Sequence, residues 1–294
     1  MNILVNYTPG HAGPKIMKGF VNAFRRLGHF VTDRPQGDEL QKSYDVILGY
    51  SGTSVIIVDE KNGLTLDAVL KACLIQYWAD DVEDINKICR RGIIFQSDLG
   101  CSEKWNALGV SNIYLPLAAD EKVFYPIEMG KRFDVILTGV PSAPRIEILK
   151  QLEGLNVAVF GQWERGWEKY SEVKKYYYGC VASENELNEL YNQSKICIDI
   201  SSPQNLNSAN FTVFNAMASG CLLITNYKTA LDGLFGAEQV PSYTGSCRSL
   251  IDKYLADEVL LKGESLRQRD VILSGHTFIH RAEDMLSILR SVTG

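Results

Sequence analysis

The sequence predicts an α/β protein made of two Rossmann-like domains that face a cleft. Short apolar strands alternate with amphipathic helices along the chain, and this alternation is typical of parallel sheets with helices on both faces. The alternation stops near residues 116–126 and then starts again. The length of 294 residues suits two domains of ordinary size, each with its own hydrophobic core.

The first domain is predicted to begin with a strand at residues 3–5 and a tight loop at 8–14. A helix with one apolar face follows, and Gly28 ends it. This opening lacks the dinucleotide-binding fingerprint, because its glycines read G-x-x-G and no acidic residue clearly closes the second strand. We expect Gly10 and Gly13 to let the backbone approach a ligand across the cleft.

The remaining elements follow from apolar runs and from helix start and stop signals. Five further strands are predicted in the first domain, at residues 46–48, 55–58, 74–78, 93–95 and 113–115. The second domain is predicted to start with a strand at 135–137, a helix at 145–152 and a strand at 157–160. Ser183 and Glu186 form a capping box ahead of the next helix. A final helix is expected around 277–292, after a polar turn at Ser274 and Gly275.

Residues 194–226 contain a buried strand, a polar loop, a helix and another buried strand in one short βαβ unit. In open parallel sheets a ligand binds beyond the carboxyl ends of the strands, where a helix N-terminus offers unpaired N–H groups. We therefore expect the residues that lead into this helix to hold an anion such as a phosphate: Asn207, Ser208, Ala209 and Asn210. The alternative interpretation is an ordinary helix start that binds nothing.

The helix of this unit reads FNAMASG at residues 214–220 and resembles the motif R-x-F-E-A-M-A-x-G of the CgeB-like, group-one glycosyltransferases, which have the two-domain GT-B fold. Two other segments resemble that family: YLPLAADEKVFYP at 114–126, its crossover between domains, and TFIHRA at 277–282, its C-terminal helix. The resemblance implies an acceptor-side domain at 1–122, a nucleotide-sugar domain at 123–275 and a helix at 276–294 that packs back on the first domain.

The resemblance also implies an activity. Such an enzyme moves a sugar from a UDP- or GDP-linked donor to an acceptor hydroxyl, needs no metal or other cofactor, and retains the anomeric configuration. Two glutamates of the family pattern correspond here to Asn207 and Asn215, and its arginine corresponds to Thr212. Because an amide accepts a hydroxyl hydrogen bond more weakly than a carboxylate does, donor binding is expected to be weaker, differently oriented or lost.

The donor site is predicted from the residues that follow each strand of the second domain. Gly139, Gly161 and Gln162 follow its first two strands, and Phe211 and Asn215 lie on the motif helix. Arg145 begins the helix after the first strand, where its guanidinium could clamp a diphosphate, although a surface arginine at a helix start is the alternative.

The first domain supplies the acceptor-side predictions. His11 follows the opening strand and is predicted to act as a base or to contact the transferred sugar; a loop histidine bonded to the backbone is the alternative. With Arg145 and Asn207 it forms the predicted catalytic set. Asp80 and Asp81 are predicted to bind acceptor hydroxyls, unless they are solvated loop carboxylates. A metal-dependent GT-A enzyme would instead use this pair as a manganese site.

The composition of the chain indicates which partners and which cellular location to expect. The net charge of −5 gives no footprint for nucleic acid or an anionic membrane, although a local basic face could still bind DNA. The seven cysteines are scattered without a C-x-x-C pair, which favours reduced thiols and argues against structural zinc. With no apolar stretch of membrane length and a strand-like start, we predict a cytoplasmic protein without a transmembrane segment.

Two alternatives to an enzyme of this family remain open. The asparagines at 207 and 215 are compatible with a protein that binds a sugar nucleotide without turnover. A Rossmann oxidoreductase is the other alternative, although the glycine fingerprint of such enzymes is missing from this sequence. No motif in the sequence identifies the acceptor, which could be a saccharide, a small molecule, a protein or a modified DNA base. No motif indicates the oligomeric state.

Overall fold

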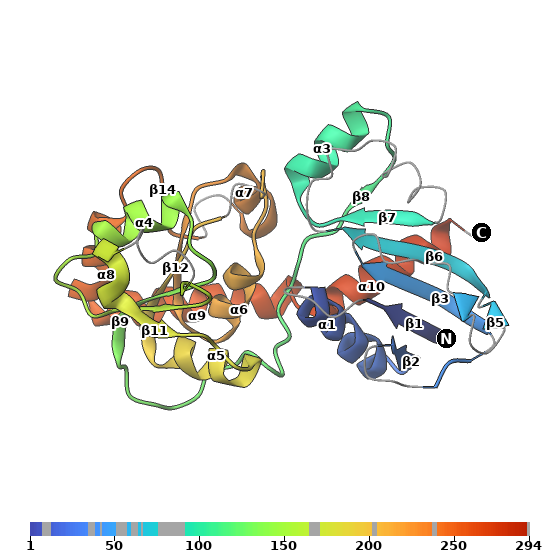
Figure 1. Cartoon of the computed structure of the whole chain (residues 1–294), viewed down its shortest axis with the longest axis horizontal. Helices are drawn as coiled ribbons and strands as arrows, with labels where there is room; N and C mark the ends of the chain where they lie inside the picture. The colour runs from blue at the N-terminus through green and yellow to red at the C-terminus, as the bar shows by residue number, and fades with distance from the viewer. Residues whose placement is uncertain are drawn as a thin grey trace. The chain divides into compact units, whose positions relative to one another are not determined.

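The computed structural model describes residues 1–7, 13–34, 39–41, 43–50, 58–59, 64–65, 67–75, 92–164, 171–201, 205–236 and 240–292. The chain divides into two compact units (Figure 1). The first comprises Met1–Leu117, Gln204–Ser208 and Phe278–Gly294, and the second comprises Ala118–Pro203 and Ala209–Thr277. Among the described helices, none has both the length and the apolar character needed to cross a membrane.

The first unit contains a six-stranded parallel sheet in the order β2-β1-β3-β6-β7-β8. Its strands are β1 (Asn2–Asn6), β2 (Phe30–Asp33), β3 (Ser43–Tyr50), β6 (Asp67–Ile75), β7 (Ile93–Gln96) and β8 (Ile113–Tyr114). A short antiparallel pair is formed by β4 (Val58–Asp59) and β5 (Leu64–Thr65). The strand order reverses direction between β1 and β3, and such a switch point is where ligands bind in open α/β sheets.

Three described helices belong to this unit: α1 (Gly13–Arg26), α3 (Leu99–Ala107) and α10 (Phe278–Ser291). Figure 1 shows α10 beside α1. The ring of Phe278 packs edge-on against Phe20, with 5.2 Å between the centroids, and it occupies the space that a Cβ on Gly19 would need. The buried Arg281 donates from Nε to the carbonyl oxygen of Pro116 at 3.0 Å. The C-terminal helix is therefore anchored in the first unit by both apolar and polar contacts.

The second unit contains another six-stranded parallel sheet, in the order β11-β10-β9-β12-β13-β14. Its strands are β9 (Phe133–Thr138), β10 (Val157–Phe160), β11 (Tyr177–Gly179), β12 (Ser194–Asp199), β13 (Leu222–Asn226) and β14 (Ser242–Tyr243). From β9 the sheet grows first to one side and then, from β12, to the other. This is the doubly wound Rossmann arrangement, and its switch point lies between β9 and β12.

The core of the second unit forms where these strands are covered on both faces. Val135, Ile196, Ile198, Leu222 and Ile224 are all buried, as expected for near-continuous apolar strands of a parallel sheet. The described helical segments are α4 (Ala143–Lys150), the 3-10 helix η3 (Ser171–Tyr176), α5 (Glu184–Asn192), α6 (Phe211–Ala218), α7 (Thr229–Phe235), α8 (Arg248–Ala256) and α9 (Glu258–Gly275).

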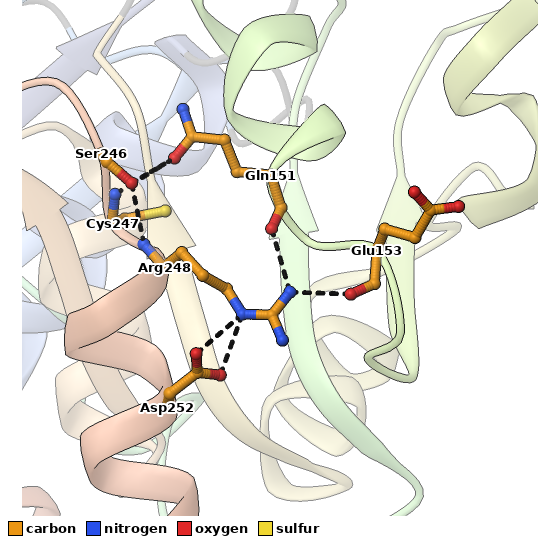
Figure 2. Close-up of polar contacts among 6 residues, drawn as sticks. All are labelled: Gln151, Glu153, Ser246, Cys247, Arg248 and Asp252. Carbon is orange, nitrogen blue, oxygen red and sulfur yellow. Dashed lines mark hydrogen bonds and ion pairs between the residues drawn. The ribbon is translucent and has the colours of Figure 1, made fainter.

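A polar cluster joins the end of α4 to the start of α8 (Figure 2). Arg248 donates from Nη1 to the carbonyl oxygens of Gln151 and Glu153, at 3.1 and 2.7 Å, and from Nε to both carboxylate oxygens of Asp252. The side-chain oxygen of Gln151 accepts from Ser246 Oγ at 2.8 Å. The bond to Gln151 O satisfies the carbonyl of the C-cap residue of α4, which has no intrahelical partner.

Three sequence predictions about this fold were wrong in detail. The strand predicted at 74–78 begins earlier, at Asp67, and residues 76–78 lie outside the described part; Lys71 interrupts the apolar run and hides its start. Asp33 does close the second strand, where its buried carboxylate accepts from Tyr7 Oη at 2.9 Å. Ser274 and Gly275 end α9 and do not form a separate turn.

The helix α9 gave a weak sequence signal because part of its buried face is polar. Gln268 is buried, and its amide accepts from the backbone N–H of Leu223 at 2.8 Å and donates to the carbonyl of the same residue at 3.0 Å. Ser265 is also buried on this helix. A periodicity search counts only apolar residues, so a buried face built on such bonds is not recognised.

Candidate functional site

Two glycine turns shape the carboxyl edge of the second sheet next to its switch point. Gly139 follows β9 with φ +118°, and Gly161 follows β10 with φ +144°, both in the region that favours glycine. A Cβ on Gly161 would lie 2.0 Å from the carbonyl oxygen of Gly139. Trp163 Nε1 donates to the same oxygen at 2.7 Å. The close approach that requires glycine here is therefore backbone against backbone.

Arg145 joins the loop after β9 to the end of β12, across the switch point. Its side chain is only 7% exposed, and it donates from Nη1 to Val140 O at 2.5 Å and from Nε and Nη2 to Ile200 O at 3.3 and 3.1 Å. Burial lowers the pKa of the guanidinium, and the nearby charge of Asp199 opposes that shift. A guanidinium has more N–H donors than these bonds use, so Arg145 retains capacity for an anion.

A buried carboxylate fixes the start of α6. Asp199 ends β12 with 1% exposure, and both of its oxygens accept from Asn210 Nδ2, at 2.7 and 2.8 Å. The other end of the Asn210 amide caps α6, because its Oδ1 accepts from Thr212 N at 2.8 Å. Burial raises the pKa of Asp199, while the bonds from Asn210 and the charge of Arg145 oppose this. Both ends of the Asn210 side chain thus serve the fold.

The side chain of Asn215 lies on the second turn of α6 and is 1% exposed. Within the described part of the chain, neither its Oδ1 nor its Nδ2 has a hydrogen-bond partner. A buried polar group left unsatisfied costs about 1–3 kcal/mol. Such a group in a native structure calls for an explanation, and a bound ligand or an ordered water would supply the missing bonds.

Two hydroxyls on the same edge of the sheet are also buried without a partner among the described residues. Ser142 occupies the N-cap position of α4 but makes no capping bond, and Tyr243 ends β14. Burial raises the pKa of Tyr243, and the charges of Asp199 and Arg145 also act on it. Neither residue was predicted from the sequence. Ser142, directly before Ala-Pro-Arg, carried a readable helix-start signal, whereas Tyr243 carried none.

Residues 145–287 match a family model described as glycosyl transferase-like. The match contains α6 with its FNAMASG motif and the whole of β12 and β13. A comparison with curated proteins gave no match.

Solved glycosyltransferase structures share the fold over nearly the whole chain. HepE from Anabaena, in complex with UDP and glucose, is 9% identical with a TM-score of 0.67, and 99% of each chain is covered. Sucrose-phosphate synthase from Thermosynechococcus elongatus is 11% identical with a TM-score of 0.63, over 99% of this chain and 98% of that chain. The DNA-modifying β-glucosyltransferase is 15% identical with a TM-score of 0.62, over 100% of each chain. The predicted GT-B fold is confirmed, and domain match and fold together support a glycosyltransferase enzyme.

The second unit brings several predicted donor residues to one edge of its sheet. Gly139, Gly161 and Arg145 follow β9 and β10, and Gln162 is exposed beside them. Phe211 begins α6 and packs edge-on against Phe124, with 6.4 Å between the ring centroids. Ala209, directly before the Asn210 cap, is buried. Their roles in binding remain predictions.

The remaining predicted residues either belong to the first unit or fall outside the described residues. Asn207 and Ser208 belong to the first unit, where they donate to the carboxylate of Asp98. Gly13 begins α1 in the same unit, and a Cβ there would lie 2.4 Å from the ring of Tyr50. His11, Asp80 and Asp81 lie outside the described residues. In the part of the chain that the structure describes, no group of three or more His, Cys, Asp or Glu side chains could hold a metal ion.

Proposed function

We propose that this chain transfers a sugar from a nucleoside-diphosphate donor to an acceptor hydroxyl, and that the donor binds at the carboxyl edge of β9 and β12. The observation that carries the proposal is the concentration of unused hydrogen-bonding capacity there. Ser142 Oγ, the Asn215 amide and Tyr243 Oη are buried without partners among the described residues. All three belong to elements that start or end at the carboxyl edge of the sheet, where ligands of doubly wound folds bind.

The proposed chemistry depends on stabilising the departing diphosphate. Negative charge builds on this group as the glycosidic bond breaks, and fixed N–H donors and cations lower the barrier by about 3 kcal/mol each. Arg145 is the buried cation at this edge, and its bonds to Val140 and Ile200 hold the guanidinium in place before a ligand arrives. The proposed reaction needs no metal and retains the anomeric configuration.

The nucleotide is proposed to be uridine diphosphate, with GDP-linked sugars as the alternative donors. The support comes from structures of the same fold, because HepE was solved with UDP and with UDP-glucose. The acceptor stays open among a saccharide, a small molecule, a protein and a modified DNA base. One similar structure, an α-glucosyltransferase, holds UDP and DNA with an HMU base. A cytoplasmic location remains a prediction from the sequence.

A thermal-shift screen followed by a turnover assay tests the proposal. UDP, GDP and their glucose-linked forms are added singly, and we expect a UDP ligand to raise the Tm because it binds only the folded chain. At about 100 times its Kd a ligand adds about 2.7 kcal/mol of stability. Release of UDP from UDP-glucose in the presence of an acceptor, unchanged by EDTA, would complete the support. If no nucleoside diphosphate raises the Tm, the proposal is wrong.

A non-catalytic sugar-nucleotide binder is the second candidate. It is favoured by one observation, the asparagines at 207 and 215 in place of carboxylates, since a neutral amide gives weaker hydrogen bonds to hydroxyls. Binding without any release of nucleoside diphosphate, across all acceptor classes, would select this candidate over the enzyme.

A further inference from the structure

Asp98 lies at the centre of a seam inside the first unit, between residues 98–100 and Asn205–Ser208. Its Oδ1 accepts from the backbone N–H of Asn207 at 3.1 Å, and its Oδ2 accepts from Ser208 Oγ at 2.9 Å. In return, the backbone N–H of Leu99 donates to the carbonyl of Asn207 at 3.1 Å. Asn205 Nδ2 also donates to Ser208 Oγ at 3.2 Å. The loop segment is therefore bonded through both backbone and side chains.

The carboxylate of Asp98 is itself held in place. Asp98 is 1% exposed and is the N-cap of α3, where its Oδ1 also accepts from Cys101 N at 3.0 Å. Its own backbone N–H donates to the side-chain oxygen of the buried Gln96 at 3.1 Å. Hydrogen bonds to an ionised acceptor are stronger than bonds between neutral groups. The position of the carboxylate is thus set by α3 and β7 before it contacts the loop.

Gly100 provides the room that the seam needs. A Cβ at this position would lie 2.9 Å from the Cβ of Leu206, 3.1 Å from the Cβ of Asn207 and 3.2 Å from the Asn207 backbone nitrogen. Glycine in a helix costs about 1 kcal/mol relative to alanine, so the glycine in α3 lowers its helix propensity but allows the close contact with Leu206 and Asn207.

We propose that Asp98 is a positioning residue for the donor site, because it fixes the conformation of Asn205–Ser208, the segment that runs into the N-cap of α6. Only Ala209 separates Ser208 from Asn210, the residue that caps this helix. The donors of Asn207 and Ser208 then serve the loop, and the diphosphate contacts fall to the residues at the carboxyl edge of β9 and β12. The inference rests on the proposed function.

The alternative, in which Asp98 competes with the diphosphate, makes a different prediction. A carboxylate that competed with the diphosphate for the Asn207 N–H would weaken nucleotide binding, and its neutralisation would then improve the affinity. The reciprocal bond from Leu99 and the close approach of Gly100 to the loop favour positioning, because both hold the segment against α3 independently of the charge.

Steady-state kinetics of Asp98→Asn and Gly100→Ala test the proposal. In both variants we expect the KM for the sugar nucleotide to rise about tenfold, since a lost bond to a charged group is worth about that factor. The KM for the acceptor stays within twofold. Gly263→Ala is the matched control: a Cβ added at this glycine of α9 would meet no atom of another segment within 4 Å, so the Tm should rise and the KM should not change.

Gly100→Ala separates positioning from simple stability. Alanine favours the helix, so a donor KM that rises without a fall in the Tm of the unliganded variant reports the contact with the loop. A donor KM within twofold of wild type in both variants, or a lower one in Asp98→Asn, would overturn the proposal.

Hydrogen exchange provides a readout that does not depend on activity. The backbone N–H of Asn207 is bonded to Asp98, so it should exchange at least tenfold faster in Asp98→Asn than in wild type, while the N–H of Leu223 in β13 keeps its protection. Unchanged exchange at Asn207 contradicts the positioning role. A wild-type chain that binds no nucleoside diphosphate contradicts the proposed function instead, so the two failures are distinct.

Discussion

At the scale of single residues, Asn215 combines deep burial with an amide that no described group satisfies. Asn192 on α5 is the contrasting case in the same unit. Its Nδ2 donates to Tyr125 O at 3.0 Å and to Asn188 O at 2.9 Å, and its Oδ1 accepts from Ile127 N at 2.7 Å. Asn192 therefore stabilises the fold, whereas the amide of Asn215 makes no hydrogen bond to any described residue and can bind a ligand.

This contrast predicts opposite effects of the same substitution. Asn215→Leu should leave the free energy of unfolding unchanged or raise it by about 1 kcal/mol, because no bond is lost, and it should abolish the Tm shift given by UDP. Asn192→Leu should lower the free energy of unfolding by about 3 kcal/mol. Urea unfolding and thermal shift measure both quantities. A full UDP-induced shift in Asn215→Leu would remove Asn215 from the donor site.

Single residues of the candidate site could be predicted from the sequence, but their hydrogen-bond partners could not. It selected the glycines at 139 and 161 and the arginine at 145, because each follows a strand that an apolar run predicts. It did not select Asp98, because the bonds of this residue to Asn207 and Ser208 join parts of the chain that are 109 and 110 positions apart. A single sequence has no signal for a contact of that kind.

At the scale of elements, the turn after β10 packs so closely against the turn after β9 that we expect no side chain to fit at Gly161. Gly161→Ala should lower the free energy of unfolding by more than about 3 kcal/mol, because the new Cβ would meet the carbonyl of Gly139 and the backbone φ is positive. Gly154→Ala is the control, with φ +84° and no atom within 4 Å of a new Cβ, and should cost about 1–2 kcal/mol. Equal losses in urea unfolding would show that the contact between the turns is unimportant.

Most elements were predictable because their burial follows a simple period. The predicted N-cap at Ser183 is confirmed, since Ser183 Oγ accepts from Glu186 N at 3.1 Å and starts α5, whereas the Glu186 side chain accepts from Ala182 N at 2.6 Å and not from Ser183 N. The two-residue strand β14 and the polar face of α9 were not predicted. A two-residue strand has no period to detect, and the buried amide of Gln268 is indistinguishable in sequence from an exposed one.

At the scale of the whole molecule, the repeated alternation of strands and helices was enough to predict two parallel sheets, and both are observed. The strand order was not predictable from this alternation. It depends on which strands pair, and the pairing is decided by long-range packing that hydropathy does not encode.

Global stability should carry the pH signature of the buried Asp199. Burial raises the pKa of this carboxyl in the folded state, so the folded chain holds its proton at pH values where the unfolded chain, with a pKa of about 3.9, has lost it. Its contribution to stability is therefore complete below about pH 4 and is lost as the pH rises through the folded-state pKa.

The variant Asp199→Asn cannot titrate at this position and isolates the effect. As the pH rises above about 4, the wild type should lose free energy of unfolding relative to Asp199→Asn, as measured by urea titrations at several pH values. Parallel pH profiles for the two proteins would show that Asp199 is ionised with an ordinary pKa in the folded chain.

The amide of Gln268 has a consequence for aggregation. Within the described residues, strand β14 pairs with β13 at Thr225 and Asn226, and the N–H and C=O of Leu223, two residues earlier, are bonded to Gln268 on α9. A side-chain amide offers the same donor and acceptor as a peptide group, so Gln268 acts as a one-residue extension of the sheet. It occupies backbone groups that would otherwise be a template for pairing with a strand of another molecule.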